Sequence, residues 1–163
     1  MTIQSTVPGA ISAVAGYLAA VAAANPSLDV ATYIGPPIET VANRFMAIGA
    51  YPNFDELVVG YRSDWAAMPA TSRWVSEEYE VAGCLRTWAG NSDPQSRLTE
   101  AFTLLNGLRE QILLDPGGGG ALSPSGSWGT FTTGMAHSGP IGGQGWGIVL
   151  TFQIQVINVR IQG

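Results

Sequence analysis

The C-terminal end of the chain, residues 146–161, carries the clearest periodic pattern in the sequence and most constrains the fold. Its first part alternates apolar with polar or smaller side chains, and the apolar series is Ile148, Leu150, Phe152, Ile154 and Val156. A period of two residues is that of a strand with one buried face. The sequence therefore predicts a long terminal strand that forms the spine of a sheet.

The alternation changes phase where Val156 and Ile157 stand side by side. From there the apolar side is carried by Ile157, Val159 and Ile161. A one-residue phase change indicates a β-bulge or a sharp bend, which we expect to turn the last residues onto a second surface. The alternative is a pair of short strands joined by a kink.

Composition favours a single domain that assembles with other subunits. With 163 residues the chain is long enough to bury a core, and we expect one domain over residues 1–163. Its residues are 46% apolar but only 12% charged. Charge normally keeps soluble proteins apart, and large uncharged surfaces usually contact a partner. Assembly is therefore the first expectation.

The charged residues and the cysteine count exclude several functions. The chain has no lysine, which rules out the lysine-containing phosphate loop of many nucleotide-binding proteins. Its arginines are scattered and its formal charge is −5, so we expect no specific nucleic-acid binding. The single cysteine, Cys84, forms no internal disulfide, which suits the reducing cytoplasm.

Residues 8–24 form the first predicted helix, with Pro8 in its first turn and a stop at Asn25-Pro26. Its apolar stripe is Ile11, Val14, Leu18 and Val21. The helix is either an ordinary core helix or one that also contacts a neighbouring subunit. As a helix, the apolar run 10–24 measures about 22 Å against about 30 Å for a bilayer core. This length is too short to span a membrane. Since no basic residue precedes the run, we also expect no export signal.

The middle of the chain predicts three further strands, at residues 28–34, 55–61 and 73–88. The second and third form an antiparallel hairpin around residues 63–72. Residues 39–54 lie between the first two strands, and their pattern is ambiguous between a short helix and a loop.

The strongest helix signal begins at Asp93, a fitting cap, followed by Pro94 in the first turn. Its apolar stripe is Leu98, Ala101, Leu105, Leu108 and Ile112. Three of its charged residues, Glu100, Arg109 and Glu110, are expected to face water. An Asp-Pro-Gly sequence at residues 115–117 ends the helix.

Residues 116–145 are rich in Gly, Ser and Pro and predict a long, flexible Gly-rich hairpin. We expect a strand at residues 128–135 and a flexible tip at 136–145 that leads into the terminal strand. We also expect that deleting residues 117–126 leaves the subunit folded and weakens its assembly.

Cys84 and His137 are the only residues of their kinds, so a Cys-His nucleophile would require them to meet in space. Cys84 falls on the strand face opposite Val81 and Leu85, whereas His137 falls in the Gly-rich tip. We therefore expect no catalytic pair.

Three acidic residues cluster on the predicted strand 73–88. Glu78 and Glu80 share one strand face and Glu77 lies on the other, so the three cannot line one metal site. They fit a solvated or inter-subunit face better. The glycines of residues 139–147 precede a strand and do not open a helix, unlike a dinucleotide-binding loop. We predict no catalytic, cofactor-binding or metal-binding residues.

Tryptophans fall mostly at predicted strand ends, at Trp65, Trp74, Trp88, Trp128 and Trp146. Aromatic residues there are typical of protein interfaces, and capping of sheet edges within one subunit gives the same pattern. Both interpretations stay open at this stage.

The order of these features resembles a known family. An apolar first helix precedes FDELVVGYRSDW (residues 54–65) and RWVSEEYEVAGCLRTWAGNSDPQSRLTEAFTLL (73–105), and a Gly-rich hairpin and an alternating terminal strand follow. In this order the chain resembles the tail terminator (tail-completion, lambda gpU-like) proteins of long-tailed bacteriophages. The resemblance covers nearly the whole chain and carries no chemical signature. It implies an α+β fold, in which a small mixed or antiparallel sheet carries two main helices on one side.

The resemblance also implies a function. Tail terminators are non-enzymatic virion proteins, made in the host cytoplasm, that form a hexameric ring on the head-proximal end of the tail tube. The ring stops polymerisation of the tube protein and joins the head-tail connector protein. DNA passes through its lumen, where an acidic subunit would not hold it. The alternatives are a head-closure or connector adaptor of the phage neck and, from another class, a small-molecule-binding domain or enzyme with residues 116–145 as a lid.

Overall fold

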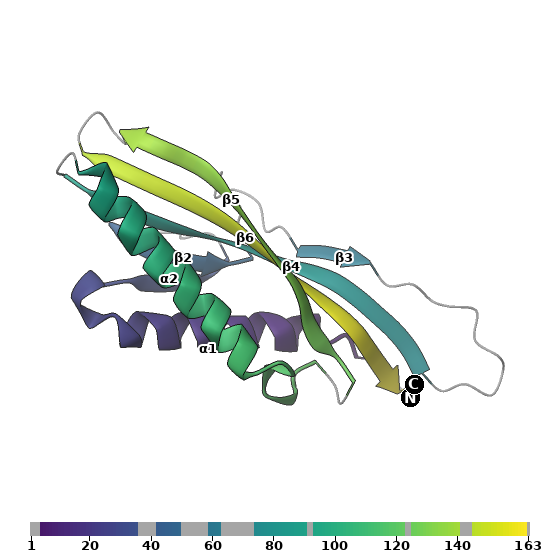
Figure 1. Cartoon of the computed structure of the whole chain (residues 1–163). Helices are drawn as coiled ribbons and strands as arrows, with labels where there is room; N and C mark the ends of the chain where they lie inside the picture. The colour runs from purple at the N-terminus through teal and green to yellow at the C-terminus, as the bar shows by residue number, and fades with distance from the viewer. Residues whose placement is uncertain are drawn as a thin grey trace.

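The computed structural model describes residues 4–35, 42–49, 59–62, 74–90, 93–122, 125–140 and 145–162. These residues form a sheet of six strands and two α-helices, which is an α+β fold, as expected (Figure 1). The helices are α1 (Val7–Ala24) and α2 (Pro94–Leu114), and two short 3₁₀ turns lie at Pro26–Leu28 and Gly118–Gly120.

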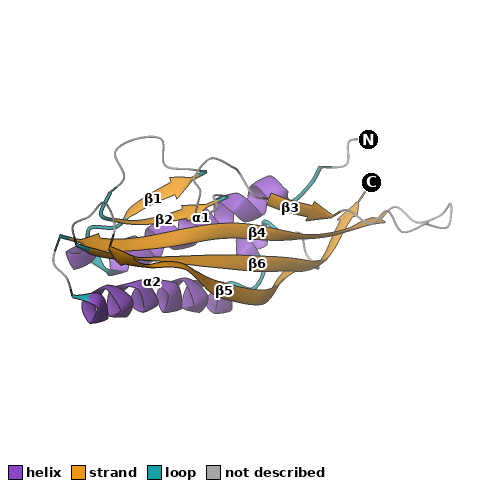
Figure 2. Ribbon diagram, turned by 90° about the horizontal axis from the view of Figure 1, so that it is seen from above, coloured by secondary structure: helices purple, strands orange, loops and turns teal. Residues whose placement is uncertain are grey.

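The strands are β1 (Ala31–Ile34), β2 (Arg44–Ile48), β3 (Val59–Arg62), β4 (Trp74–Ala89), β5 (Ser127–Pro140) and β6 (Trp146–Gln162). They lie in the order β1-β2-β4-β6-β5, and β3 pairs with β4 off this path. Only the β1–β2 pair is parallel among the described pairs, so the sheet is mixed. The three long strands β4, β6 and β5 lie side by side (Figure 2).

Both helices cover the same face of the sheet, and the core lies between them and that face. The apolar stripe predicted for α1 faces this core, with Val14 and Leu18 at 0% exposure. In α2 the predicted stripe is buried from Ala101 to Ile112, and Leu98 at its start is partly buried. Asp93 caps the helix by accepting a hydrogen bond from the backbone N–H of Ser96 at 3.3 Å.

The predicted bulge in the terminal strand is confirmed. Val156 pairs with Tyr79 and Val159 with Glu77, so two residues of β6 lie opposite the single residue Glu78 of β4. Both Val156 and Val159 have 0% exposure and belong to the same core. The bulge therefore keeps the end of the strand on the core face. The expectation that it turns the chain onto a second surface is wrong.

The other predicted strands are found with shifted ends. β1 begins at Ala31 because a 3₁₀ turn occupies Pro26–Leu28, and β4 matches the predicted strand 73–88 to within a residue. β3 and β4 pair antiparallel, as the predicted hairpin requires. Residues 55–58 and 63–72, also part of that prediction, lie outside the described residues.

Residues 44–48 form strand β2, so the helix-or-loop expectation for this part of residues 39–54 is wrong. β2 lies between β1 and β4, and its residues Phe45, Met46, Ala47 and Ile48 all have 0% exposure. A strand covered on both faces has no apolar-polar alternation, which removes the signal that identifies a strand. Residues 39–41 and 50–54 lie outside the described residues.

The Gly-rich region is more ordered than expected. Strand β5 continues to Pro140, so residues 136–140 of the predicted flexible tip are strand, because pairing with β6 satisfies the backbone whatever the side chains. Gly118 is buried and Leu122 has 0% exposure in the core. The expectation that residues 117–126 are dispensable for folding is therefore not supported. Residues 123–124 and 141–144 lie outside the description.

Candidate interaction surface

Strand β5 forms one edge of the sheet and is open along most of its length. Every residue from 129 to 138 is exposed except Phe131, which is partly buried. The strand contains no Asp, Glu, Lys or Arg, although proteins commonly use charge to keep an open edge from pairing. Its protection is limited to Pro140 and two register irregularities, so the stretch between them is free to pair with another strand.

An apolar strip flanks this edge on the helix side. Met135 pairs with the buried Leu150 but is itself 54% exposed. Phe131 stacks on Phe152 with ring centroids 6.0 Å apart, and the guanidinium of Arg109 lies 5.2 Å above the Phe131 ring. The sequence predicted that Arg109 faces water, but its guanidinium packs over an aromatic ring. The strip is a place where β5 offers apolar area to a partner.

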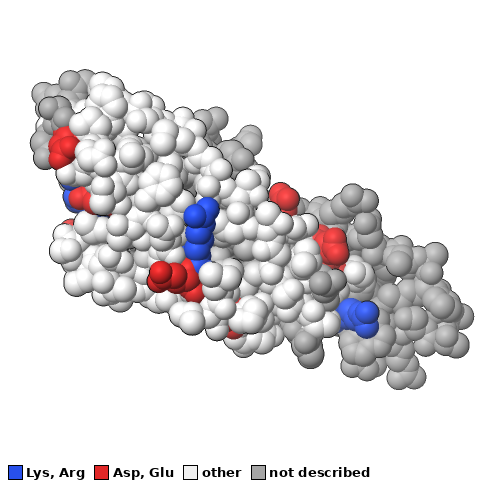
Figure 3. All heavy atoms as spheres, in the orientation of Figure 1, with Lys and Arg blue, Asp and Glu red and all other residues white. Residues whose placement is uncertain are grey.

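Helix α2 adds a further apolar side chain to this flank. Phe102 is 42% exposed and precedes Arg109 by two helical turns, so the two side chains leave the helix on the same side. The surrounding face has few charged side chains (Figure 3). A partner that covers this flank would desolvate little charge.

The start of β5 is fixed to the rest of the subunit through Trp128. Its indole N–H donates to the backbone oxygen of Asp115 at 2.9 Å, and its ring meets the Tyr17 ring edge-on with centroids 6.1 Å apart. The Tyr17 hydroxyl donates to Asp115 Oδ2 at 2.8 Å. Burial raises the pKa of Tyr17 to about 12, with help from that hydrogen bond. The open part of β5 thus extends from a buried, hydrogen-bonded start.

The tryptophans at residues 128 and 146 favour packing within their own subunit. Trp128 is 9% exposed and packs inside its own subunit, which favours edge capping for this residue. Trp146 also packs against the core and is partly buried. The side chains of Trp65 and Trp74 lie outside the description.

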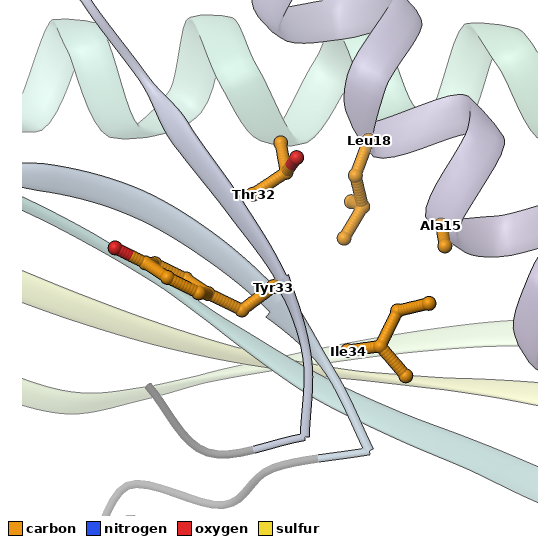
Figure 4. A pocket seen from close by; sticks show the side chains of 5 residues that line it. All are labelled: Ala15, Leu18, Thr32, Tyr33 and Ile34. Atoms are coloured by element: carbon orange, nitrogen blue, oxygen red, sulfur yellow. The ribbon is translucent and has the colours of Figure 1, made fainter. Parts of the chain in front are cut away.

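The opposite edge of the sheet is β1, where a hollow of about 200 Å³ lies between the strand and α1. The residues that line it are Ala15, Leu18, Thr32, Tyr33 and Ile34 (Figure 4). Tyr33 points away from Leu18 in this view, so the hollow is bounded mainly by aliphatic side chains and the Thr32 hydroxyl. Ile34 is 67% exposed. No acid, amine or imidazole lines the hollow, which suits an apolar group better than a polar substrate.

The structure keeps Cys84 and His137 apart. Cys84 lies on β4 and His137 on β5, with β6 between them, and strands are spaced by about 4.8 Å. Cys84 is buried with Phe45 and Ala47 on the sheet face away from the helices, and burial raises its thiol pKa to about 12. His137 is exposed. Among the described residues these two do not form a nucleophile pair.

The three glutamates separate as predicted, but Glu77 has a role that the sequence did not show. Glu78 and Glu80 are exposed, whereas Glu77 is 1% exposed. Its carboxylate accepts hydrogen bonds from the hydroxyl of Ser5 at 2.6 Å and from the backbone N–H of Thr6 at 2.8 Å. The sequence signal for this role was that Glu77 falls on the apolar side of its strand.

Glu100 was expected to face water, but its carboxylate is held by two arginines. Arg44 of β2 contacts it through two nitrogens, at 2.9 and 3.0 Å, and Arg97 lies 2.8 Å from the same carboxylate. Arg97 is only 6% exposed. The cluster joins α2 to the strand that the sequence failed to predict. Glu110 is exposed, as expected.

Two further observations bear on other kinds of site. Within the described ranges, no three His, Cys, Asp or Glu residues gather as a metal site. Helix α1 is longer than the apolar run 10–24, and by length and composition it would suffice to cross a membrane. In the structure 28% of this helix is buried.

Comparisons with protein-family models and with curated proteins gave no match to this chain.

Proposed function

We propose that this protein is a non-enzymatic structural protein of a bacteriophage virion. In this proposal it caps the head-proximal end of the tail tube as a ring of identical subunits, which the resemblance suggests is a hexamer. The ring stops the tube protein from polymerising and presents a surface to the head-tail connector. The protein is made in the host cytoplasm and acts in the virion, without cofactor or membrane.

The observation that carries this proposal is the open, uncharged edge strand β5. An edge strand of 14 residues, most of them exposed and none of them Asp, Glu, Lys or Arg, is a liability in a free monomer, because its unpaired backbone groups invite uncontrolled addition of another strand. Subunits closed into a ring would cover such an edge while leaving no end free. The largely uncharged helix face supports assembly in the same way.

The charge of the subunit fits passage of DNA through the ring. The sheet face away from the helices presents Glu78 and Glu80 as exposed acids. The formal charge of the chain is −5. Like charges repel, so a lumen built from such subunits would let DNA slide without holding it.

The test is the length of tails in a phage lysate that lacks this protein, measured by electron microscopy. We expect overlong tubes unattached to heads, and tails of normal length on heads when the protein is supplied from a plasmid. Tails of normal length beside heads that leak DNA would instead assign the protein to head closure. A chemical activity of the purified protein, lost in Cys84→Ala or His137→Ala, would contradict any purely structural role.

A further inference from the structure

We infer that the subunits join head to tail through the two edges of the sheet. In this arrangement β5 of one copy pairs antiparallel with β1 of the next, and Met135 enters the hollow between α1 and β1 of that neighbour. The inference rests on the proposed function, because the ring is the assembly proposed above. It adds the surface that holds the ring together.

The strand order places the two edges at opposite ends of the sheet. β5 ends one side of the path β1-β2-β4-β6-β5, and β1 ends the other. A contact between two different surfaces of one chain is heterologous, and it closes into a ring where the rotation between neighbouring subunits divides a full turn evenly. Both strands are free of charged residues, so pairing would bury no charge from either strand.

The strand directions also fit. β5, β6, β4 and β2 alternate in direction along the sheet, and β1 runs parallel to β2. Consequently β5 runs antiparallel to β1 of its own subunit. If two copies stand side by side with their helices on the same face, the β5 edge of one copy meets the β1 edge of the other in an antiparallel pair.

The register places Met135 level with the hollow. Across one row of the sheet, Met135 pairs with Leu150, Leu150 with Leu85, Leu85 with Met46, and Met46 with Thr32. All five positions lie on the helix-covered side. Two copies joined without stagger would therefore set Met135 of one opposite Thr32 of the next, and a stagger of two residues would keep the same faces together.

The hollow and Met135 match in chemistry. The hollow measures about 200 Å³ and is bounded by Leu18, Ala15 and Ile34 beside Thr32. Methionine is unbranched and flexible, so it adapts to irregular apolar gaps. Insertion would cover two exposed apolar side chains together, Met135 at 54% and Ile34 at 67% exposure.

The competing arrangement is a two-fold dimer in which β5 pairs with β5. That dimer would cover Met135, but it would leave β1, Ile34 and the hollow open. Head-to-tail pairing covers both edges, which is why we favour it.

Cysteine cross-linking separates the two arrangements. In a Cys84→Ala background, Thr32→Cys on β1 and Thr133→Cys on β5 place one thiol on each edge, at exposed positions on the same sheet face. A short bis-maleimide should join the double variant into a ladder of covalent multimers. The two single variants mixed together should give only dimers, and neither alone should give any.

The same cross-linking is performed on purified protein and on tails isolated from a lysate that carries the variants. Dimers from Thr133→Cys alone would establish β5–β5 pairing and overturn the inference. Failure of the double variant to cross-link in both preparations would overturn it as well.

A charge placed at position 135 gives a second readout. We expect Met135→Glu to weaken subunit association at least about tenfold, because the hollow offers no partner for a carboxylate. Its unfolding transition should stay that of the wild type, since Met135 is 54% exposed. Asn106→Glu is the matched control, because Asn106 is an exposed residue of α2 that lines a groove with residues of α1 and α2 and with none of β1 or β5, and it should associate normally. Unimpaired association of Met135→Glu by native mass spectrometry would contradict the proposed insertion.

Failure of this inference and failure of the proposed function are distinguishable. If the double cysteine variant fails to cross-link but tubes are overlong without the protein, the edge pairing is wrong and tail termination stands. If β1 and β5 cross-link but tails keep their normal length without the protein, the interface stands and the assigned role is wrong.

Discussion

Glu77 and Thr6, 71 positions apart in the sequence, are joined by two hydrogen bonds, from the backbone N–H of Thr6 at 2.8 Å and from its hydroxyl at 2.7 Å. Thr6 is the residue before α1, and its own side chain does not cap the helix. The carboxylate of Glu77 therefore takes the place of a local cap, and its negative charge lies at the positive end of the helix dipole. A strand residue thus fixes where α1 begins.

We expect Glu77→Ala to lower the free energy of unfolding by about 2–4 kcal/mol, because the hydroxyl of Ser5 and the partly buried N–H and hydroxyl of Thr6 lose their charged acceptor. Glu77→Gln should cost less, since the amide oxygen can still accept. Urea denaturation measures both. Glu80→Ala, an exposed acid on the same strand, is the control and should unfold like the wild type. Equal midpoints for Glu77→Ala and Glu80→Ala would show that the cap is not needed.

The carboxylate of Glu100 should be equally important to the contact between α2 and β2. Its removal in Glu100→Ala leaves Arg97, 6% exposed, and Arg44 without their acid. We expect a loss of about 2–4 kcal/mol, reduced from the full cost of an unpaired buried charge because Arg44 keeps some contact with water. Glu110→Ala on the solvent side of α2 serves as the control. A thermal melt in which both variants match the wild type would refute this role.

The turn after α2 should behave as core. Leu122→Ala removes a side chain at 0% exposure, and we expect a loss of about 2–4 kcal/mol. The matched control is Leu114→Ala, because Leu114 is 79% exposed and should tolerate the same change. Deletion of residues 117–126 should abolish cooperative unfolding in calorimetry. A deletion protein that melts cooperatively near the wild-type temperature would restore the sequence-based expectation of a dispensable loop.

Local periodicity explains what the sequence could predict. The helices around Leu18 and Leu105, the first half of β4 up to Val81 and the strand around Ile154 each have one buried face and one more exposed face, so their side chains repeat with the period of the element. The bulge in β6 was visible for the same reason, since it breaks that period. β2 was missed because it is buried on both faces, and the end of β5 was missed because backbone pairing with β6 orders it whatever its composition.

The candidate surface depended on information that no local pattern carries. That β5 is an edge follows from the strand order, and the alignment of Met135 with Thr32 follows from four separate pairings across the sheet. The role of Glu77 likewise needs a contact between segments distant in sequence. Residue types alone could exclude a lysine-based phosphate loop, but they could not show which apolar side chains stay exposed.

Stability should fall at alkaline pH because of Cys84. Burial raises the pKa of its thiol from 9.0 to about 12, so between these values the unfolded chain loses a proton that the folded chain keeps. The folded state then binds more protons, and the free energy of unfolding must decrease as pH rises through this window. Tyr17 and Tyr79, whose pKa values burial raises to about 12, add to the decrease at the upper end. Urea midpoints of the wild type and Cys84→Ala, measured from about pH 8 to about pH 11, should therefore diverge, with the wild type falling more steeply. Parallel curves would mean that the thiol ionises equally in both states and is not buried.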